Sequence, residues 1–463
     1  MDVLLPGECA MTISGGVEAV AFTPLIEVGV HPERALVHEH GWQSWTPTTT
    51  YRLGAPPHRP SSEHRRVMSW RPDRVAPADA YQGEGLLVVD PGDGSPAHRL
   101  ATFDPRGSVP SIRAEGSGDR VVVSATGPVR HDLCPGGVHA ALVGWAEELA
   151  KAAGLRPGSA RPTPTMWCSW YGYQQEITDR VILDNADDIE RLDLPVDVVQ
   201  IDDGYQREIG DWTSAAPSFG SLRALADELL ARGRRVGIWT APFLVGERSD
   251  LARRHPEWLV GDTDLGAHWD QRLFALDVTH PAAADHLRSV FAGFRDMGID
   301  VFKLDFLYAG AVAGRRRSPV GDLDAYHAGM ALIREAVGPD SYVIGCGAPI
   351  IPSVGHVDAM RVSNDIAPHW EHENGDLALG GGRGAVMTGA ARAFQHGRLW
   401  VNDADCVLAA PRVERREQWA AHVRAYGGLR ASGDRLADLD EWGIAVTREL
   451  LSTAPPATPF TDP

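Results

Sequence analysis

Two side chains of opposite charge interrupt one short apolar stretch of the sequence, Val301-Phe302-Lys303-Leu304-Asp305-Phe306. The stretch follows Gly298, a typical helix stop, and its apolar run predicts a buried strand. Charges in a strand that is covered on both faces are costly unless they serve a purpose. Because Lys303 and Asp305 are two positions apart, both side chains leave the strand on the same face. The pattern indicates either a structural ion pair or two groups that meet a ligand where the strand ends.

Seven further apolar runs of this kind follow Met166 and alternate with amphipathic helices. The predicted strands are 166–170, 198–201, 236–239, 301–305, 342–346, 359–363, 399–402 and 429–432. The helices between them carry apolar residues at spacings of three and four, and several end at a glycine, such as Gly233, Gly298 and Gly338. Eight strand–helix units over roughly 290 residues predict an α/β fold, a (β/α)8 TIM barrel.

The chain before the barrel has a different pattern. Val17–Phe22 and Val121–Val123 are strand-like, and turn signals recur between such runs, which predicts a β-rich, sandwich-like domain. A helix is predicted over Val138–Ala153, followed by a stiff linker with two prolines. The expected organisation is a β-rich N-terminal domain at 1–135, a connecting helix and linker at 136–165, the barrel at 166–455 and a disordered tail at 456–463.

Two tryptophans, Trp42 and Trp45, lie close together in a turn-like stretch of the N-terminal domain. One interpretation is that they fill the core of this domain. The other is that they form an aromatic lip over a neighbouring site. The sequence leaves both open.

Composition narrows the classes of function. The 463 residues include 44 Lys+Arg and 62 Asp+Glu, a net charge of −18, which argues against nucleic acid or an anionic membrane as partner but not against a neutral sugar. The five cysteines are scattered without a C-x-x-C pair, so neither a disulfide framework nor a zinc finger is expected, and a reducing compartment fits. With no signal peptide or membrane-spanning run in view, the expected location is cytoplasmic.

The ends of the predicted strands are unusually polar or aromatic, and a barrel enzyme keeps its active site at those ends. The positions are Ser169-Trp170-Tyr171, Asp202-Asp203, Trp239, Lys303 with Asp305, Cys346-Gly347, Arg361 to Asp365, and Asn402 to Asp405. Any one of these residues could belong to a solvated loop. Solvated loops do not explain why all of them occur at the same end of one barrel. Carboxylates beside tryptophans predict a carbohydrate site, because sugars offer hydroxyls to carboxylates and C–H faces to indoles.

Glycoside hydrolysis needs two carboxyl groups that flank the anomeric carbon. Asp305 is the better candidate for the nucleophile, because a nearby cation, Lys303, favours its ionised form. Asp365 is the better candidate for the acid/base, since a dry site beside a second carboxylate raises a pKa as an acid requires.

These motifs, taken in order, resemble glycoside hydrolase family 36 of clan D, the α-galactosidases, over residues 40–455. The resemblance rests on Gly41-Trp42-Gln43-Ser44-Trp45, Trp167-Cys168-Ser169-Trp170-Tyr171, Ile201-Asp202-Asp203-Gly204-Tyr205, Gly237 to Phe243, Lys303-Leu304-Asp305-Phe306, Arg361 to Asp365, and Asn402 to Asp405. It implies a retaining exo-glycosidase that hydrolyses terminal α-galactosides by double displacement, with Asp305 as nucleophile and Asp365 as acid/base.

The resemblance also implies the contacts to the sugar. Asp202 and Asp203 would hold O4 and O6, Lys303 would reach O3 and O4, and Arg361 the O2/O3 side. The remaining expected substrate-binding residues are Trp239 and Trp170 as walls, Tyr171 beside them, Cys346 near O2, and Trp42 or Trp45 as the closing tryptophan. The expected partner is a small α-galactoside or an oligosaccharide, and an oligomer of the chain fits as well.

Other functions fit parts of the same pattern. A transglycosylase that makes raffinose-type oligosaccharides would use the same two aspartates, as would an α-N-acetylgalactosaminidase or a β-L-arabinopyranosidase. A catalytically dead sugar-binding protein is the alternative from another class. The stretch His369-Trp370-Glu371-His372-Glu373 invites a metal interpretation, but it is not His-Glu-x-x-His and no third ligand is evident. We therefore expect neither a metal nor a cofactor.

Overall fold

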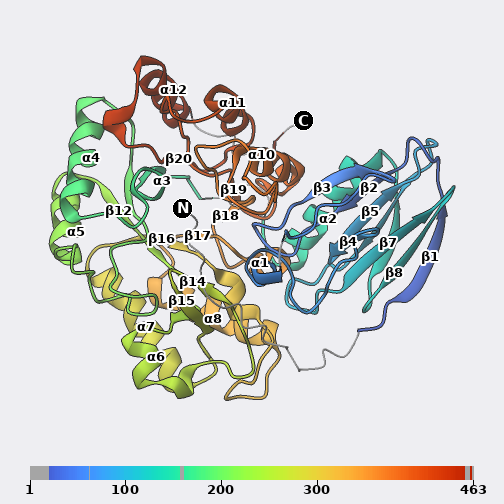
Figure 1. The fold of residues 1–463 in the computed structure, drawn as a ribbon, viewed down its shortest axis with the longest axis horizontal. Coiled ribbons are helices and arrows are strands. Elements are labelled where there is room, and N and C mark those ends of the chain that lie inside the picture. The colour runs from blue at the N-terminus through green and yellow to red at the C-terminus, as the bar shows by residue number, and fades with distance from the viewer. Residues whose placement is uncertain (1–19, 62, 157–160, 454–458, 461–463) are drawn as a thin grey trace, which may run out of the picture.

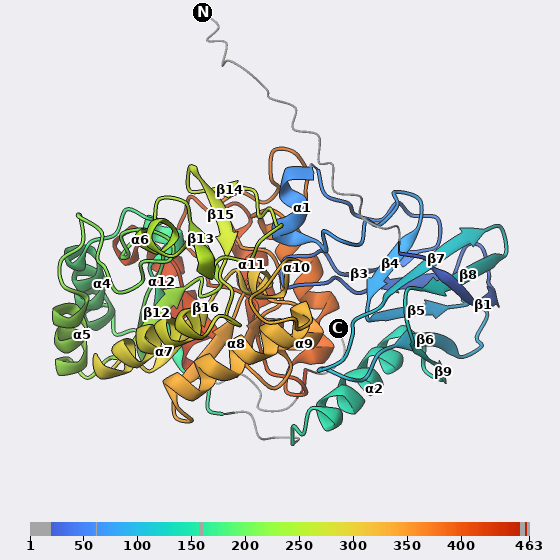
Figure 2. The same ribbon diagram turned by 90° about the horizontal axis from the view of Figure 1, so that it is seen from below.

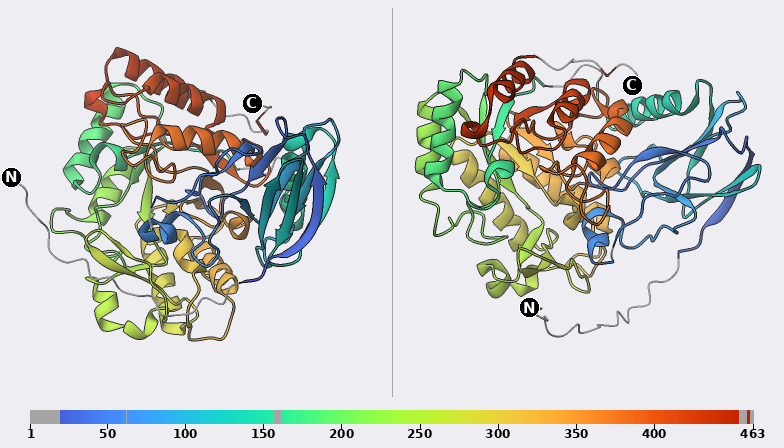
Figure 3. Two further views of the ribbon diagram at one scale, coloured as in Figure 1. Left: turned by 45° about the vertical axis from the view of Figure 1, so that its right-hand side comes forward. Right: turned by 45° about the horizontal axis from the view of Figure 1, so that its top comes forward.

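The structure is a computed structural model that describes residues 20–61, 63–156, 161–453 and 459–460. An antiparallel β-sandwich and an eight-stranded parallel barrel lie side by side (Figure 1). Turning the molecule shows that the sandwich packs against the flank of the barrel and not across its axis (Figure 3). None of the helices in the described ranges is long and apolar enough to cross a membrane.

The N-terminal sandwich consists of two antiparallel sheets that enclose an apolar core. One sheet has the order β1 (Thr23–Gly29), β8 (Arg120–Ala125), β7 (Ser111–Ser117), β4 (Tyr81–Glu84). The other has the order β3 (Thr49–Arg52), β2 (Leu36–Glu39), β5 (Leu86–Asp90), β6 (Ala97–Ala101), β9 (Arg130–Cys134). The predicted strand at Val121–Val123 is confirmed inside β8. The predicted strand at Val17–Phe22 is wrong for residues 20–22, because β1 begins at Thr23; residues 17–19 lie outside the described ranges.

Strand β5 is apolar at successive positions because both of its faces are covered. Leu87 belongs to the core between the two sheets, whereas Leu86 packs with the helix α2 (Gly137–Ala152) on the outer face. The predicted helix at 138–153 is thus confirmed, and Figure 2 shows it running along the sheet. On its other side Trp145 contacts Phe394 of the barrel, with ring centroids 6.1 Å apart.

The barrel sheet is parallel throughout, and all eight predicted strands are confirmed, with ends that differ by at most two residues. The strands are β10 (Thr165–Cys168), β11 (Val198–Ile201), β12 (Arg235–Thr240), β16 (Val301–Leu304), β17 (Tyr342–Gly345), β18 (Ala359–Arg361), β19 (Val401–Asp403) and β20 (Arg430–Ser432). β10 pairs with both β11 and β20, and a bridge between Asp403 and Leu429 joins β19 to the β20 side.

Helices follow the strands as the apolar spacings predict. The main ones are α4 (Asp179–Arg191), α5 (Leu222–Ala231), α7 (Pro281–Asp296), α8 (Asp322–Val337), α10 (Gly382–Ala391), α11 (Arg416–Tyr426) and α12 (Glu441–Ser452); the short ones are α3 (Trp170–Tyr173), α6 (Asp250–Arg254) and α9 (Ile350–Ser353). The glycines predicted to stop helices, Gly233, Gly298 and Gly338, have φ of 76°, 80° and 79°, the left-handed region that glycine enters without a Cβ clash.

Two additions lie at the mouth of the barrel. The connection after β12 forms a small sheet from β13 (Leu244–Gly246), β14 (Ala267–His268) and β15 (Gln271–Ala275). The short helix α1 (Glu63–Ser69) reaches the same end from the N-terminal part of the chain (Figure 2). Most of the C-terminal tail that was predicted to be disordered lies outside the described ranges; within residues 459–460, Phe460 stacks on His396 at 3.9 Å between ring centroids.

Candidate active site

One cavity of about 210 Å³ opens at the C-terminal ends of the barrel strands. Eight of the predicted site residues line it: Trp45, Trp170, Asp202, Asp203, Trp239, Lys303, Asp305 and Asp365. Its other lining residues are Met68, Ser69, His268, Trp269, Phe306, Ala378, Leu379 and Gly380. The sequence thus predicted half of the wall, and the two additions to the barrel mouth supply half of the remainder.

Strand β16 places its two charged side chains as the period of two requires. Val301 joins the apolar cluster inside the barrel, whereas Phe302 and Leu304 pack outward toward the helices. Lys303 and Asp305 therefore both face the barrel axis, and both line the cavity. No hydrogen bond or ion pair within the described structure joins them directly, so a Lys303–Asp305 structural ion pair does not form.

Lys303 pairs instead with Asp202, with its Nζ 3.0 Å from Asp202 Oδ2. Burial alone would lower the pKa of Lys303, but the Asp202 carboxylate and, more weakly, Asp305 raise it well above its usual value. The ammonium group is therefore a fixed positive charge in the cavity wall.

Asp305 is held by two neutral donors. Trp239 Nε1 donates to Asp305 Oδ2 at 3.0 Å, and the backbone N–H of Phe306 donates to Oδ1 at 2.7 Å. The two contacts fix the orientation of the Asp305 carboxylate, with one donor on each oxygen.

Asp202 and Asp203 both face the cavity, although regular alternation would send them to opposite faces. β11 ends at Ile201, and Gly204 has φ 116°, so the extended pattern is broken directly after the strand. Asp203 accepts from three neutral donors, namely Gln175 Nε2 and Trp269 Nε1, both at 2.9 Å, and Gln206 Nε2. Burial raises the pKa of Asp203, and these hydrogen bonds oppose that rise.

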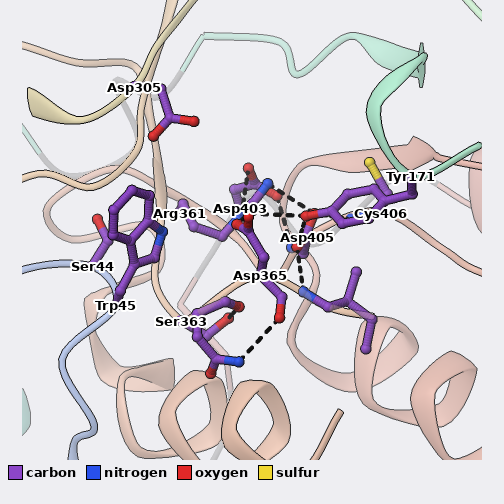
Figure 4. A network of polar contacts seen from close by, with 12 residues as sticks. Ser44, Trp45, Tyr171, Asp305, Arg361, Ser363, Asp365, Asp403, Asp405 and Cys406 are labelled. Atoms are coloured by element: carbon purple, nitrogen blue, oxygen red, sulfur yellow. Dashed lines mark hydrogen bonds and ion pairs between the residues drawn. The ribbon is translucent and has the colours of Figure 1, made fainter. Parts of the chain in front are cut away.

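Asp365 belongs to a different electrostatic environment, a cluster of carboxylates around one guanidinium (Figure 4). Arg361 Nη1 lies 2.8 Å from Asp365 Oδ1, Nη2 lies 2.8 Å from Asp405 Oδ1, and Nε lies 3.3 Å from Asp403 Oδ2. Tyr171 donates its hydroxyl hydrogen bond to Asp405. Asp305 takes no part in this network, as Figure 4 shows.

Three carboxylates share the single positive charge of Arg361, and this shapes the titration of Asp365. Desolvation raises the pKa of Asp365 to about 7, the negative charges of Asp405 and Asp305 act in the same direction, and Arg361 opposes them. Two-fifths of the side chain remains accessible from the cavity, so the proton can reach a bound molecule. The two aspartates of this cavity thus lie in different environments: Asp305 accepts from neutral donors, whereas Asp365 shares one guanidinium with two other carboxylates.

Trp45 and Trp42 have separate environments. Trp45 lines the cavity and packs edge-on against Phe306, with ring centroids 5.0 Å apart. Gly347 permits this approach: it has φ 53°, and a Cβ there would lie 2.9 Å from Trp45 Cη2. Trp42 does not line the cavity and instead lies under the guanidinium of Arg71, 4.7 Å from the ring centroid. Of the two predicted closing tryptophans, the structure therefore brings only Trp45 to the site.

Three other predicted contacts lie beneath the cavity wall. Arg361 and Cys346 are buried and Tyr171 is partly buried, and none of the three lines the cavity. Burial, together with nearby Asp305, raises the pKa of the Cys346 thiol well above its usual value. Arg361 holds the lining residue Asp365, whereas Tyr171 donates to Asp405, a second partner of Arg361.

Trp269 and Phe306 are the main site residues that sequence reasoning missed. Trp269 and Asp270 form the two-residue turn between β14 and β15, with φ of 52° and 54°, a conformation unfavourable for a bulky residue. Phe306 also has a positive φ, 49°, and packs on Trp269 at 5.1 Å between ring centroids. The only signal in the sequence was Phe306 itself, directly after Asp305; nothing predicted the hairpin.

The His369–Glu373 stretch lies in the loop after β18. His369 Nε2 contacts the Gly380 carbonyl at 2.8 Å, and His372 contacts Asn374. Within the described ranges no group of three or more His, Cys, Asp or Glu side chains is arranged to hold a metal ion.

Comparisons with known proteins agree with this geometry. Residues 158–328 match the Melibiase family model. TtGalA, an α-galactosidase from Thermus thermophilus, has been solved in complex with p-nitrophenyl α-D-galactopyranoside and in complex with stachyose. The first complex superposes with a TM-score of 0.79 at 27% identity over 93% of this chain and 88% of that one. The GH36 α-galactosidase AgaA from Geobacillus stearothermophilus shares the fold, with a TM-score of 0.60 at 14% identity over 92% of this chain and 61% of that one.

Curated relatives match over a shorter stretch. The bifunctional α-galactosidase/sucrose kinase AgaSK of Mediterraneibacter gnavus is 32% identical over 105 residues, which are 21% of this chain and 11% of that protein. An α-galactosidase of Escherichia coli is 26% identical over 106 residues, 21% of this chain and 15% of that protein. The matched stretch is thus a small part of these relatives. Together with the fold and the site, the comparisons agree with the resemblance to the α-galactosidases of glycoside hydrolase family 36 that is seen in the sequence.

Proposed function

We propose that the chain is a retaining α-galactosidase that removes terminal α-galactosyl units. The observation that carries the proposal is the pair of aspartates in one cavity: Asp305 is held by neutral donors, and Asp365 has a pKa raised to about 7. The Thermus thermophilus enzyme, which has a closely similar fold, binds p-nitrophenyl α-galactoside and stachyose, and this supports the same substrate class here.

In the proposed first step Asp305 attacks the anomeric carbon while Asp365 gives its proton to the leaving oxygen. The C–O bond to the leaving group breaks as the bond from the anomeric carbon to Asp305 forms. In the second step Asp365, now ionised, takes a proton from water, and that water displaces Asp305. Two inversions at one carbon give net retention of the α configuration.

The rest of the wall would bind and orient the sugar. Asp202 and Asp203 accept hydroxyl donors, and Lys303, fixed by Asp202, donates to the same side. Trp239, Trp170 and Trp45 offer apolar faces to the ring. Arg361, Tyr171 and Cys346 support this wall from below. In this proposal the barrel, residues 166–455, supplies the two catalytic aspartates. The β-rich domain, residues 1–135, supplies part of the wall that closes the cavity.

The proposal is tested by turnover of p-nitrophenyl α-galactoside with NMR detection of the first sugar released. We expect α-galactose to appear first and to mutarotate later. Absence of turnover would reject the hydrolase, and β-galactose as first product would reject the double displacement.

A further inference from the structure

Asp405, which follows strand β19, belongs to the cluster around Arg361 but has no role in the proposed reaction as stated so far. Its side chain is 0% exposed, and it does not line the active-site cavity. It is therefore placed to act on other residues and not on a bound sugar. Figure 4 shows it between Arg361 and Tyr171, with Asp365 beside them.

The carboxylate of Asp405 accepts from two donors on each of its oxygens. Oδ1 lies 2.8 Å from Arg361 Nη2 and accepts from the backbone N–H of Cys406 at 2.7 Å. Oδ2 accepts from the hydroxyl of Tyr171 and, at 2.8 Å, from the backbone N–H of Ile366. A carboxylate has about four acceptor positions, so these donors occupy all of them. The geometry is that of an ionised group, because a proton on either oxygen would point at a donor.

Two of these four donors support Asp365 directly. Ile366 follows Asp365 in the chain, so the hydrogen bond from its N–H fixes the backbone on one side of Asp365. Arg361 Nη1 lies 2.8 Å from Asp365 Oδ1, and Asp405 holds the other end of the same guanidinium through Nη2. Asp405 thus supports both the backbone and the side-chain partner of Asp365.

The backbone of Asp405 has an unusual conformation, with φ 89°. Residues with a Cβ rarely adopt a positive φ, although Asp and Asn do so more readily than most. Such conformations persist only where the surrounding structure enforces them, and they are enriched at active sites. Here the four donors to the carboxylate enforce it, together with Asp403 Oδ1, which accepts from the Asp405 N–H at 2.9 Å.

The charge of Asp405 matters as well as its contacts. An arginine beside a carboxylate favours the ionised form, which would deprive an acid of its proton. Desolvation raises the pKa of Asp365 to about 7, Arg361 opposes that rise, and the negative charge of Asp405 supports it. Asp405 therefore offsets the unfavourable effect of the guanidinium that orients Asp365.

Other titratable groups also surround Asp365. Asp305 on the β16 side acts in the same direction as Asp405, and Lys303 acts against it. Burial raises the pKa of the Tyr171 hydroxyl and of the Cys346 thiol well above their usual values, so both stay neutral. Of the negative charges that act on Asp365, only that of Asp405 comes from a side chain remote from the sugar.

We propose that Asp405 is a positioning residue for the acid/base step: it orients Asp365 through Arg361 and Ile366, and its charge offsets that of Arg361. Arg361 can then hold the Asp365 carboxyl group in place without fixing it in the ionised form. The inference rests on the proposed function, in which Asp365 is the acid/base.

The test is kcat/KM of Asp405→Asn as a function of pH, with methyl α-galactoside and p-nitrophenyl α-galactoside. Asn tolerates the positive φ and keeps the size of the side chain, but it has no charge and one acceptor oxygen. The alkaline limb for methyl α-galactoside should move by about one pH unit or more toward acid, which is about a tenfold loss above that limb. The loss for p-nitrophenyl α-galactoside should be several-fold smaller, because its leaving group needs little protonation.

Asp403→Asn is the matched control, because Asp403 is another carboxylate partner of Arg361 but makes no hydrogen bond to the Ile366 N–H. It should move the alkaline limb by less than half as much. Tyr171→Phe removes one donor to Asp405 without changing any charge, and it is the second variant if Asp405→Asn does not fold. Its loss of kcat/KM should again be larger for methyl α-galactoside than for p-nitrophenyl α-galactoside.

Thermal unfolding shows whether each variant is folded before it is assayed. An unmoved alkaline limb in Asp405→Asn, an equal loss for the two substrates, or an equally large shift in Asp403→Asn would each overturn the inference. If Asp405→Asn does not fold, an equal loss for the two substrates in Tyr171→Phe overturns it. Failure of the proposed function is a different result, since the wild type would then show no turnover or Asp365→Asn would keep the alkaline limb of the wild type.

Discussion

The two sides of the active-site cavity are built by opposite means. On the barrel side, charged residues stand at strand ends and are fixed by ion pairs and hydrogen bonds, such as Lys303–Asp202 and Arg361–Asp365. On the N-terminal side, the residues that face the cavity are Trp45, Met68 and Ser69, which carry no charge. We refer to these as the floor and the rim.

A buried cation helps to hold the rim in place, beside backbone hydrogen bonds that join Trp42 and Ser44 to Ile350 and Ala348. Arg392, which follows α10 in the barrel, donates to the backbone carbonyls of Gly41, Gln43, Ser44 and Thr46 at 2.6 to 3.4 Å. Among the described residues no carboxylate pairs with it. The floor thus depends on the register of the barrel strands, whereas the rim depends on the docking of one loop. Substitutions in the floor should alter chemistry, and substitutions in the rim should alter binding.

The largest expected effect comes from the floor residue that we assign as nucleophile. Asp305→Ala should lower kcat for p-nitrophenyl α-galactoside by about 10⁴-fold or more, because no covalent intermediate can form. Azide should restore part of the rate by attack from the vacated face, and the product should be β-galactosyl azide. A variant that kept a tenth of the wild-type rate, or that gave α-galactosyl azide, would show that Asp305 has another role.

The second-largest expected effect distinguishes the role of Asp365 from that of Asp305. Asp365→Asn should cost about 10²–10⁴-fold for a substrate with a poor leaving group, such as an alkyl α-galactoside, and much less for p-nitrophenyl α-galactoside. The acid must be protonated to act, and the pKa of Asp365 is raised to about 7. The wild-type rate with the poor leaving group should therefore be full below that pH and fall above it.

The pH–rate profile of Asp365→Asn is the control for that assignment. Removal of the titrating group should remove the alkaline fall while the variant keeps its melting temperature. An unchanged alkaline limb would assign the titration to another group.

The elements of the floor were predictable from sequence, and the reason is geometric. A strand has a period of two, so Lys303 and Asp305 had to share a face, and the C-terminal ends of parallel strands had to share an edge. The partner of Lys303 was not predictable, because Asp202 follows a different strand, 101 positions earlier. Nor was the hairpin that carries Trp269, because its turn sequence, Trp-Asp, is not one that favours two left-handed residues.

A smaller effect concerns recognition at the floor. Asp203→Asn should lower kcat/KM for p-nitrophenyl α-galactoside by roughly 10- to 100-fold, because a charged acceptor is lost. Asp203 is the sharper test of the pair, since Asp202→Asn would also strip the buried Lys303 of its counter-ion. Trp269→Phe is the matched variant, as it removes one of the three donors to Asp203 and keeps an aromatic ring.

The ratio of activity on the α-galactoside to that on the matched α-glucoside reports this role. In the wild type it should strongly favour galactose, and it should fall in Asp203→Asn because the axial O4 loses its acceptor. A wild-type ratio near one would show that the Asp202–Asp203 pair does not recognise the orientation of the O4 hydroxyl.

The smallest effect tests the rim and, with it, the distinction between rim and floor. Trp45→Ala should raise KM about tenfold through loss of an aromatic wall, with a smaller change in kcat. Trp42→Ala is the internal control, because Trp42 lies three positions away in the same loop but packs under the guanidinium of Arg71 and does not line the active-site cavity. It should change KM only in so far as it lowers the melting temperature.

The two tryptophans are nearly equally buried, each 7% exposed, so burial alone predicts equal effects. The structure predicts unequal ones, because only Trp45 contacts Phe306, the residue after the proposed nucleophile. If Trp42→Ala and Trp45→Ala both raise KM in proportion to the fall in melting temperature, the rim residues only stabilise the fold. In that case the floor alone binds the substrate. If Trp45→Ala lowers kcat as severely as a floor substitution does, the rim takes part in the chemical step, and the separation of binding from chemistry along the two sides of the cavity is wrong.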